Sequence, residues 1–207
     1  MKDHSLRDYQ QEMIARVHKE WESHRSVMVQ MPTGTGKTHV LASIVASFSG
    51  KILVVAHRRE LVEQIRETIL KWRIENEKLK NTEIINHKSE IINHKSYITV
   101  SSIQAISRRI DSLDFCPDLI IIDEAHHALA KTYRMLWERW PEAKFLGLTA
   151  TPCRMDQTGF TDLFDTLVSS WSIAEFIRKG VLSAFDYVSI RPDSEEQRLV
   201  DMLQILG

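Results

Sequence analysis

The sequence predicts an α/β fold with a doubly wound, mostly parallel sheet and helices on both of its faces. Five short runs are rich in β-branched and aliphatic residues, and such continuous apolar runs are typical of strands buried on both faces. They lie at residues 27–30, 51–56, 97–100, 119–122 and 144–148. Helical patterns separate these runs, and the short connections favour right-handed crossovers between parallel strands. We therefore expect ligands to bind at the carboxyl ends of the strands.

The helical segments are recognised by apolar residues that recur at every fourth position and so lie on one face of a helix. One such stripe precedes the first strand and consists of Met13, Val17 and Trp21. A second follows the second strand and consists of Leu61, Ile65 and Ile69. Each stripe predicts an amphipathic helix that packs against the sheet.

A seven-residue duplication interrupts this pattern before the third strand. The string EIINHKS occupies residues 83–89 and is repeated at residues 90–96. An odd repeat length would turn the isoleucines of one continuous strand to opposite faces, and asparagine, histidine and serine are indifferent helix formers. We interpret the duplication as a loop beside a strand, without a chemical role. A metal pair of His87 and His94 is the weaker alternative, because no matching cluster of ligands accompanies it.

The composition predicts a soluble, cytoplasmic globular protein. The 207 residues are 43% hydrophobic, which suffices for one domain, or one domain with an appendage. The net charge of −1 excludes a global basic field, so nucleic acid would have to bind a local patch. Cys116 and Cys153 lie far apart, which argues against a zinc site or a disulfide framework. The polar N-terminus is no signal peptide, and no apolar run approaches the ~18 residues of a membrane span.

The stretch VMVQMPTGTGKTHV has the strand, turn and helix that a phosphate-binding loop requires. Gly34 and Gly36 permit unusual backbone dihedral angles, which lets amide groups approach phosphate oxygens. Lys37 would neutralise the β- and γ-phosphates, and the Thr38 hydroxyl would ligate Mg²⁺ at the positive end of the helix. Met31 stands where the strict motif has glycine, at the strand exit. The alternative is a simple turn that precedes an exposed lysine.

Two adjacent carboxylates, Asp123 and Glu124, follow the apolar run LIII directly. A strand end would present them in the same crevice as the phosphate loop. Asp123 suits a Mg²⁺ contact through water, and Glu124 suits a general base for attack on the γ-phosphate. An acidic N-cap of the next helix is the alternative, and it is compatible with the functional role. A zinc pair of His126 and His127 is disfavoured, because adjacent helical residues point in different directions.

The run KFLGL ends in Thr149-Ala150-Thr151-Pro152, where small hydroxyl groups can bond carboxylates or a γ-phosphate. Alone this signal is no stronger than a strand followed by a turn. In the order MPTGTGKT, DEAH and TATP, however, the three strings resemble motifs I, II and III of superfamily 2 helicases. That family tolerates a residue other than glycine at the position of Met31, which supports the phosphate loop.

Further strings extend this resemblance over residues 5–190. LRDYQQEMI resembles the Q-type motif whose glutamine reads adenine, and VVAHRRELVEQ and TVSSIQAI resemble motifs Ia and Ib, which touch the nucleic-acid backbone. WSIAEFIRKGVLSAFDYVSI resembles the segment that leaves the first motor lobe. The branch that the chain resembles most is the DEAH-type motor of type III restriction subunits and related DNA repair helicases.

The resemblance implies a RecA-like P-loop NTPase fold, with KFLGL between the phosphate-loop strand and the LIII strand. It implies ATP and Mg²⁺ as cofactors, and it assigns each site to residues of this sequence. The nucleotide would be bound by Arg7, Gln10, Pro32, Thr33, Gly34, Thr35, Gly36, Lys37 and Thr38. The metal would be held by Thr38 and Asp123, and the catalytic groups would be Lys37, Asp123, Glu124 and His126.

The resemblance also implies a surface for nucleic acid and a link between it and the nucleotide. The residues that would meet phosphates of a bound strand are His57, Arg58, Ser101, Ser102 and Gln104. A solvated surface arginine remains the alternative for Arg58. The residues that would couple the nucleotide to strand binding and lobe movement are His126, Thr149 and Thr151.

The predicted domain boundary lies near residue 190. Residues 1–190 would form the first RecA-like ATP-binding domain, and residues 191–207 would be a linker or the start of a second lobe. No string after residue 190 resembles the later motifs, among them the one that supplies arginine fingers, which contribute about 10³–10⁵ in rate. We therefore expect the chain alone to be a monomeric fragment that hydrolyses ATP very slowly and does not unwind.

We interpret the chain as the ATP-binding lobe of a nucleic-acid-dependent ATPase or helicase. The alternative is a nucleotide-gated nucleic-acid-binding switch or translocase module without strand unwinding, although Lys37, Asp123 and Glu124 are intact. A P-loop kinase is disfavoured, because DEAH followed by TATP suits activation of water. Contacts to the backbone do not report the sugar, and the restriction-like resemblance favours DNA over RNA as the partner.

Overall fold

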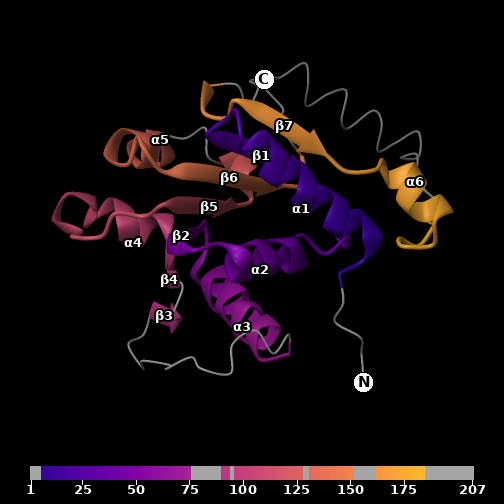
Figure 1. The fold of residues 1–207 in the computed structure, drawn as a ribbon, viewed down its shortest axis with the longest axis horizontal. Helices are drawn as coiled ribbons and strands as arrows, with labels where there is room; N and C mark the ends of the chain where they lie inside the picture. Colours follow the sequence, from indigo (N-terminus) through magenta and orange to yellow (C-terminus); the bar gives the residue numbers. More distant parts are fainter. Residues whose placement is uncertain (1–5, 76–89, 94–95, 128–130, 152–161, 185–207) are drawn as a thin grey trace, which may run out of the picture.

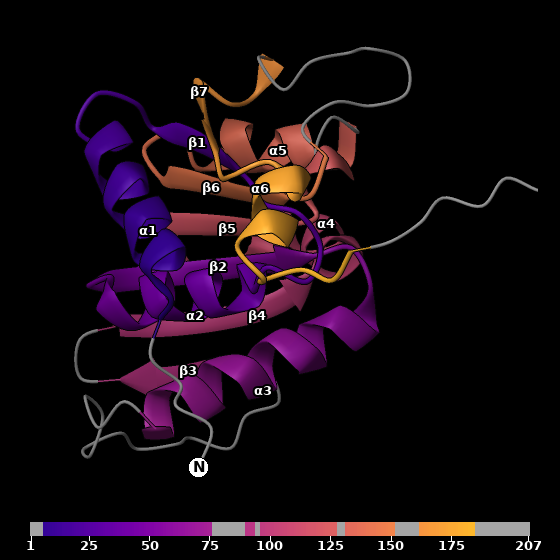
Figure 2. The ribbon, with the colours of Figure 1, turned by 90° about the vertical axis from the view of Figure 1, so that its right-hand side faces the viewer.

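In the computed structural model, which describes residues 6–75, 90–93, 96–127, 131–151 and 162–184, the strands form one sheet (Figures 1 and 2). The strand order in the described chain is β3-β4-β2-β5-β6-β1-β7, and every neighbouring pair is parallel except β3 and β4. The strands are β1 (Ser26–Gln30), β2 (Gly50–Ala56), β3 (Glu90–Asn93), β4 (Ser96–Ser102), β5 (Leu119–Asp123), β6 (Lys144–Thr149) and β7 (Thr166–Ser169). This sheet confirms the predicted α/β class and all five predicted strands.

Helices cover both faces of the sheet. They are α1 (Asp8–Glu20), α2 (Lys37–Ser47), α3 (Arg59–Glu75), α4 (Ile103–Ser107), α5 (Lys131–Arg139) and α6 (Ile173–Arg178), with 3-10 turns η1 (Ile110–Ser112) and η2 (Ala125–His127). The apolar stripes predicted for α1 and α3 point into the core, as expected. Among the described residues, none of the helices combines the length and the apolar character that a membrane span requires.

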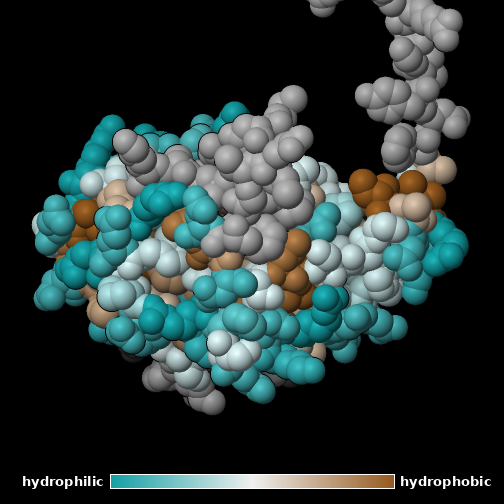
Figure 3. Space-filling view, turned by 90° about the horizontal axis from the view of Figure 1, so that it is seen from above, coloured by the Kyte–Doolittle hydropathy of each residue, from teal (hydrophilic) through white to brown (hydrophobic). Residues whose placement is uncertain are grey.

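Two apolar clusters fill the space between the sheet and the helices. One contains residues of α1, α2, α3 and α6, and the other contains residues of α4 and α5. Consecutive residues of β1 alternate between them, because Val27 and Val29 join the first cluster and Met28 joins the second. Strand β1 is therefore buried on both faces, as its continuous apolar sequence predicts. The face shown in Figure 3 is mostly hydrophilic. Apolar residues gather on it at the α6 end, and Ile173 of α6 is 50% exposed.

The strand order places the three predicted motifs at one end of the sheet. Strand β6 lies between β1 and β5, as the resemblance implied. The register pairs Gln30 with Thr149 and Asp123 with Leu148. The loops that follow β1, β5 and β6 consequently emerge side by side at the carboxyl ends of the strands.

The duplicated string differs from the loop that we expected. Four residues of its second copy form β3, which pairs antiparallel with β4 and sets Ile91 opposite Ile98. Two β-branched isoleucines favour a strand, and the edge of β4 offers backbone groups for pairing. The first copy with His87, as well as His94, lies outside the described residues. Within the described part of the chain, no group of three or more Cys, His, Asp and Glu side chains could hold a metal ion.

Candidate active site

The phosphate loop joins β1 to α2 through two glycines with left-handed backbones. Gly34 and Gly36 both have φ of 83°, a region that residues with a Cβ rarely adopt. Between them, Thr35 closes a tight turn, because its Oγ1 donates to the Pro32 carbonyl at 2.7 Å and its amide donates to the same oxygen at 3.3 Å. Gly36 is the N-cap of α2, which begins at Lys37. The loop therefore delivers the positive end of a helix to the carboxyl edge of the sheet.

Met31 is a core residue and not a defect of the loop. Its side chain is 0% exposed, and its amide donates to the Thr149 carbonyl at 2.9 Å, which extends the pairing of β1 with β6. The ammonium group of Lys37 donates to the Met31 carbonyl at 3.2 Å. Thr33 is exposed and Thr38 is half-buried at the start of α2. The methionine thus anchors the strand exit, while the residues predicted to meet phosphate lie further along.

The start of α1 contacts the loop through the predicted adenine-reading glutamine. Gln10 is 6% exposed, and its Nε2 donates to the carbonyls of Thr35 at 3.2 Å and Gly36 at 3.4 Å. Its Oε1 accepts the backbone amide of Arg7 at 2.9 Å, and the Gln10 amide donates to the Arg7 carbonyl at 2.8 Å, so the glutamine is tied to the N-terminus of α1. A Cβ at Gly36 would collide with Gln10 Nε2, so the glycine also makes room for this contact. The side-chain amide of Gln10 consequently bonds the loop and the backbone of α1.

A contact that our sequence reasoning missed comes from the residue before this glutamine. Tyr9 is 4% exposed, and its hydroxyl donates to the Thr35 carbonyl at 2.7 Å. Tyr9 lies four residues before Met13, so it continues the apolar stripe of α1 by one turn toward the N-terminus. That pattern indicates burial, but it contains no signal for a hydroxyl that reaches the phosphate loop.

Asp123 and Glu124 occupy the end of β5, as predicted. Burial raises the pKa of Asp123, the neighbouring Glu124 raises it further, and the Glu124 amide and Lys37 oppose both effects. Burial and the charge of Glu124 thus outweigh the stabilisation that Lys37 gives the Asp123 carboxylate. Glu124 has φ of 52°, the one positive value for a residue other than glycine in the described ranges. Such a backbone is strained and turns the chain sharply at this position.

Contacts through His126 link Glu124 to the end of β6. Thr149 is fully buried, and its hydroxyl donates to the Thr151 carbonyl at 2.8 Å, so it must accept from His126 Nδ1 at 3.1 Å. This assigns a proton to Nδ1, which also lies 3.3 Å from Glu124 Oε2. The amide of Thr151 donates back to the Thr149 hydroxyl at 3.1 Å. The structure thereby brings together the predicted base and all three predicted coupling residues. The side chain of His127 lies outside the described residues.

The predicted nucleic-acid residues gather at the ends of β2 and β4. The register pairs Ala56 with Ser102, so His57 and Arg58, which follow β2, lie next to the end of β4. Ser102 is the N-cap of α4, and its hydroxyl accepts an amide from the first turn at 3.3 Å. Both Ser101 and Ser102 are 8% exposed, whereas Arg58 and Gln104 are exposed. The exposed arginine and glutamine are thus the side chains that a bound strand could reach directly.

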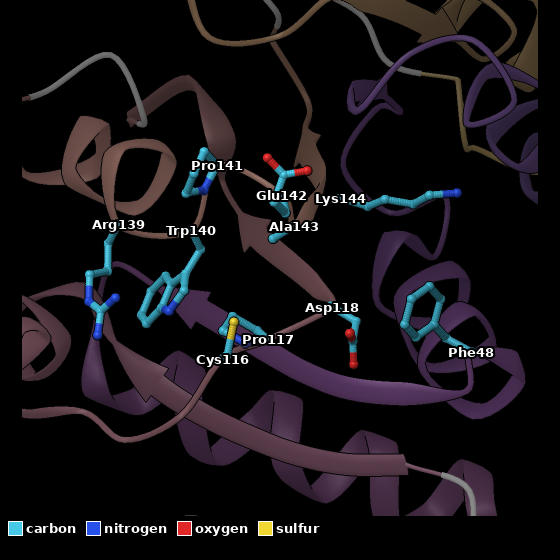
Figure 4. Close-up of a pocket in the computed structure, with 10 residues that line it drawn as sticks. All are labelled: Phe48, Cys116, Pro117, Asp118, Arg139, Trp140, Pro141, Glu142, Ala143 and Lys144. Carbon is cyan, nitrogen blue, oxygen red and sulfur yellow. The ribbon is translucent and has the colours of Figure 1, made fainter.

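A separate cleft lies at the opposite end of the sheet (Figure 4). Its walls include Phe48, Cys116 and Trp140, together with Asp118 and Lys144. Asp118 directly precedes β5 and Lys144 begins β6, so the cleft lies at the amino ends of these strands. It contains none of the residues that the sequence predicts for the site.

Two of the chain's relatives are named as a helicase and a translocase. It is 29% identical over 218 residues to the putative ATP-dependent helicase IRC3 of Saccharomyces cerevisiae, which covers 92% of this chain and 30% of the relative. It is 31% identical over 163 residues to the DNA 3'-5' translocase XPB2 of Sulfurisphaera tokodaii, which covers 79% of this chain and 34% of that protein. The chain thus spans about a third of the length of these relatives.

The fold is similar to that of the Type ISP restriction-modification enzyme LlaGI, solved as a nuclease-deletion mutant with a DNA substrate mimic. The TM-score is 0.64 over 86% of this chain and 21% of that chain, at 16% identity. This likeness confirms the predicted RecA-like α/β fold. The sequence model of the family described as type III restriction enzyme, res subunit, matches residues 3–154, which contain all three motifs of the site. The chain therefore belongs to this restriction-subunit family and forms the first motor lobe of a superfamily 2 helicase.

Proposed function

We propose that this chain is the ATP-binding lobe of a nucleic-acid-dependent ATPase that acts on DNA. The observation that carries the proposal is the meeting of three elements at one end of the sheet. They are a glycine-rich loop that opens a helix, the carboxylates Asp123 and Glu124, and the hydrogen-bonded group of His126 and Thr149. A phosphate-binding loop beside two acids is the arrangement that hydrolysis of a nucleotide requires.

In this proposal the loop holds the phosphates through backbone amides and Lys37. The Lys37 ammonium lies at the loop, bonded to the Met31 carbonyl at 3.2 Å, and an incoming phosphate would offer it a charged acceptor. Thr38 and Asp123 would hold Mg²⁺, because a hydroxyl and a carboxylate oxygen are ligands that this ion prefers. When bound, Mg²⁺ would neutralise charge on the phosphates. Gln10 and Arg7 would border the adenine.

Glu124 is the proposed general base. Glu124 directly follows β5 with a left-handed backbone, and His126 Nδ1 lies 3.3 Å from its Oε2. This contact with His126 would fix the orientation of the carboxylate and leave its other oxygen to accept a proton from water. Thr149 and Thr151 continue this link to the end of β6. Loss of the γ-phosphate would therefore alter the conformation at the end of β6.

The proposed nucleic-acid surface is formed by Arg58 and Gln104, with Ser101, Ser102 and His57 between them. One relative is named as a DNA translocase, and the family is that of a restriction subunit, which favours DNA over RNA. Because the chain spans about a third of its relatives, we propose that a second lobe supplies the remaining catalytic groups. Residues 1–190 would then be the first lobe, and residues 191–207 would be a linker or the start of the second lobe.

A binding experiment tests the nucleotide site directly. A fluorescent ATP analogue should bind the 207-residue chain in Mg²⁺, and Lys37→Ala should weaken binding strongly, because a charge-assisted contact is lost. Lys51→Ala removes an exposed lysine at the start of β2, at the other end of the sheet, and should leave affinity unchanged. Equal affinity of the Lys37→Ala variant and the unmodified chain would contradict the proposal.

An activity experiment tests the catalytic role. Full-length protein should hydrolyse ATP faster with DNA than with RNA, and Glu124→Gln should abolish turnover while it retains nucleotide binding. The isolated chain should show little turnover. Turnover that survives Glu124→Gln would refute the assignment of the base, and binding without stimulated hydrolysis in full-length protein would favour a nucleotide-gated switch.

A further inference from the structure

The chain that follows β7 returns to the phosphate loop, although it lies outside the matched family segment at residues 3–154. Helix α6 lies at the end of the sheet toward which β7 points, near the start of α1 (Figure 1). Its first turn is fixed by a capping box. Ser172 Oγ accepts the Glu175 amide at 3.2 Å, and Glu175 Oε2 accepts the Ser172 amide at 3.3 Å.

The last turn of α6 is fixed by a glycine in the left-handed region. Gly180 has φ of 70°, and its amide donates to the Ile177 carbonyl at 2.9 Å. The amide of Val181 donates to the Phe176 carbonyl at 2.9 Å, which completes a Schellman motif. A short helix capped at both ends has a defined exit direction, and here that direction leads the chain toward the phosphate loop.

The residue that reaches the loop is Leu182. A Cβ at Gly34 would lie 3.2 Å from Leu182 Cδ2, so the leucine side chain lies directly against the glycine. The amide of Leu182 donates to the Phe176 carbonyl at 3.2 Å, which ties this contact to α6. Leu182 is half-buried and packs against the apolar cluster that α1 and α2 share.

An aromatic cluster joins α6 to the other side of the loop. The ring of Tyr9 lies 5.0 Å from that of Phe176 and 5.3 Å from that of Trp171. Phe176 is 0% exposed, and the Lys179 ammonium lies 3.7 Å above the Trp171 ring. The hydroxyl of Tyr9 donates to the Thr35 carbonyl at 2.7 Å, so the cluster ends on the phosphate loop.

We propose that Tyr9 and Leu182 are positioning residues for the nucleotide, and that residues 171–182 belong to the nucleotide-binding structure. Tyr9 would hold the loop at Thr35 from the α1 side, and Leu182 would pack it at Gly34 from the α6 side. A loop held in its binding conformation loses less entropy when phosphate arrives. The inference rests on the proposed nucleotide site, and it adds the end of the described chain to that site.

Nucleotide affinity of the 207-residue chain tests this inference. Tyr9→Phe keeps the aromatic ring and removes the hydroxyl, and it should weaken binding of a fluorescent ATP analogue about 2- to 10-fold. Leu182→Ala should weaken binding several-fold, and Leu182→Met should restore it. Gly180→Ala should weaken binding as well, because alanine disfavours the left-handed region, whereas Gly180→Asn should be closer to the unmodified chain. No atom lies within 4 Å of a Cβ at Gly180, so no clash complicates this pair.

A matched control separates positioning from stability. Leu167 is also a half-buried leucine, but it packs on the other face of the sheet. Leu167→Ala should lower the melting temperature without a change in nucleotide affinity. Linkage requires the reverse effect too, so the analogue should slow hydrogen exchange at the amides of Val181 and Leu182.

The outcomes distinguish this inference from the proposed function. If Lys37→Ala loses nucleotide while Tyr9→Phe and Leu182→Ala bind as the unmodified chain does, the inference is wrong and the nucleotide site stands. If Leu167→Ala weakens binding as much as Leu182→Ala, lost stability explains the effect and the inference is again wrong. If Lys37→Ala binds nucleotide normally, the proposed function itself fails.

Discussion

The hydroxyl of Tyr133 is buried on α5 and has no hydrogen-bond partner among the described residues. The side chain is 2% exposed and belongs to the apolar cluster under α4 and α5. Burial raises the pKa of Tyr133 from 10.0 to about 12, and the negative charge of Asp123 adds to this shift. Both the raised pKa and the missing hydrogen bond would be removed by Tyr133→Phe.

The shift in pKa fixes the sign of a pH effect on stability. Between pH 10 and pH 12 the unfolded chain releases the Tyr133 proton, while the folded chain retains it. The folded state then binds more protons, so the free energy of unfolding falls as pH rises through this window. Two pKa units correspond to about 3 kcal/mol, which would be lost by pH 12 and is fully present below pH 10.

Tyr133→Phe should remove this alkaline loss. At pH 8 the variant should be as stable as the unmodified chain or about 1 kcal/mol more stable, because an unpaired buried hydroxyl is removed. Urea unfolding followed by circular dichroism, repeated from pH 8 to pH 11.5, measures both effects. Tyr97→Phe, at a half-buried tyrosine, controls for general alkaline unfolding. A loss of more than ~1 kcal/mol at pH 8 would mean that the hydroxyl makes a stabilising bond. An unchanged alkaline decline would refute the assignment to Tyr133.

Three further changes test packing and capping by urea unfolding. Gly147→Ala should cost about 1–3 kcal/mol, because the new Cβ would lie 2.6 Å from Phe164 Cζ in a packed core; an unaffected midpoint would mean that the ring can move aside. Asp165→Ala should cost about 1 kcal/mol, because Oδ2 accepts two backbone amides at the start of β1, at 2.9 and 3.0 Å. Ser172→Ala should cost about 1 kcal/mol through the lost cap on the Glu175 amide, with Ser172→Thr closer to the unmodified chain.

The parts of the fold that the sequence predicts well are those in which one pattern decides the structure. A continuous apolar run has to be buried on both faces, and all five such runs became parallel strands. Strand β3 was missed because the duplication offers no periodic signal and its pairing depends on the free edge of β4. Strand β7 was missed because it contains only two consecutive apolar residues, Leu167 and Val168, which are too short a run to indicate a strand.

The same reasoning explains which parts of the site could be predicted. Lys37 and Asp123 converge because each follows a strand of one parallel sheet, and topology alone brings such residues together. Tyr9 and Leu182 could not be predicted, because they approach the loop from positions far away in the chain. Their contacts depend on how α1 and α6 pack, and no local pattern specifies that packing.

The hydrogen bonds of the phosphate loop explain why it suits an anion. A phosphate is repelled by carbonyl oxygens and attracted by amide hydrogens. The carbonyl oxygens of the loop therefore have to accept hydrogen bonds from other groups. The Met31 carbonyl accepts from Lys37, and the Pro32 carbonyl accepts twice from Thr35. The Thr35 carbonyl accepts from Tyr9 and Gln10, and the carbonyl of the next glycine accepts from Gln10 and from two amides of α2.

Two of these donors come from α1, so the N-terminal helix matters to the loop through charge as well as packing. If Tyr9 or Gln10 lost its donor, the Thr35 carbonyl would expose partial negative charge next to the phosphates. The loss in affinity should then grow with the charge of the ligand, from an ADP analogue to an ATP analogue. A loss that is equal for both nucleotides would mean that Tyr9 only holds the conformation of the loop and does not change the electrostatic potential at the phosphates.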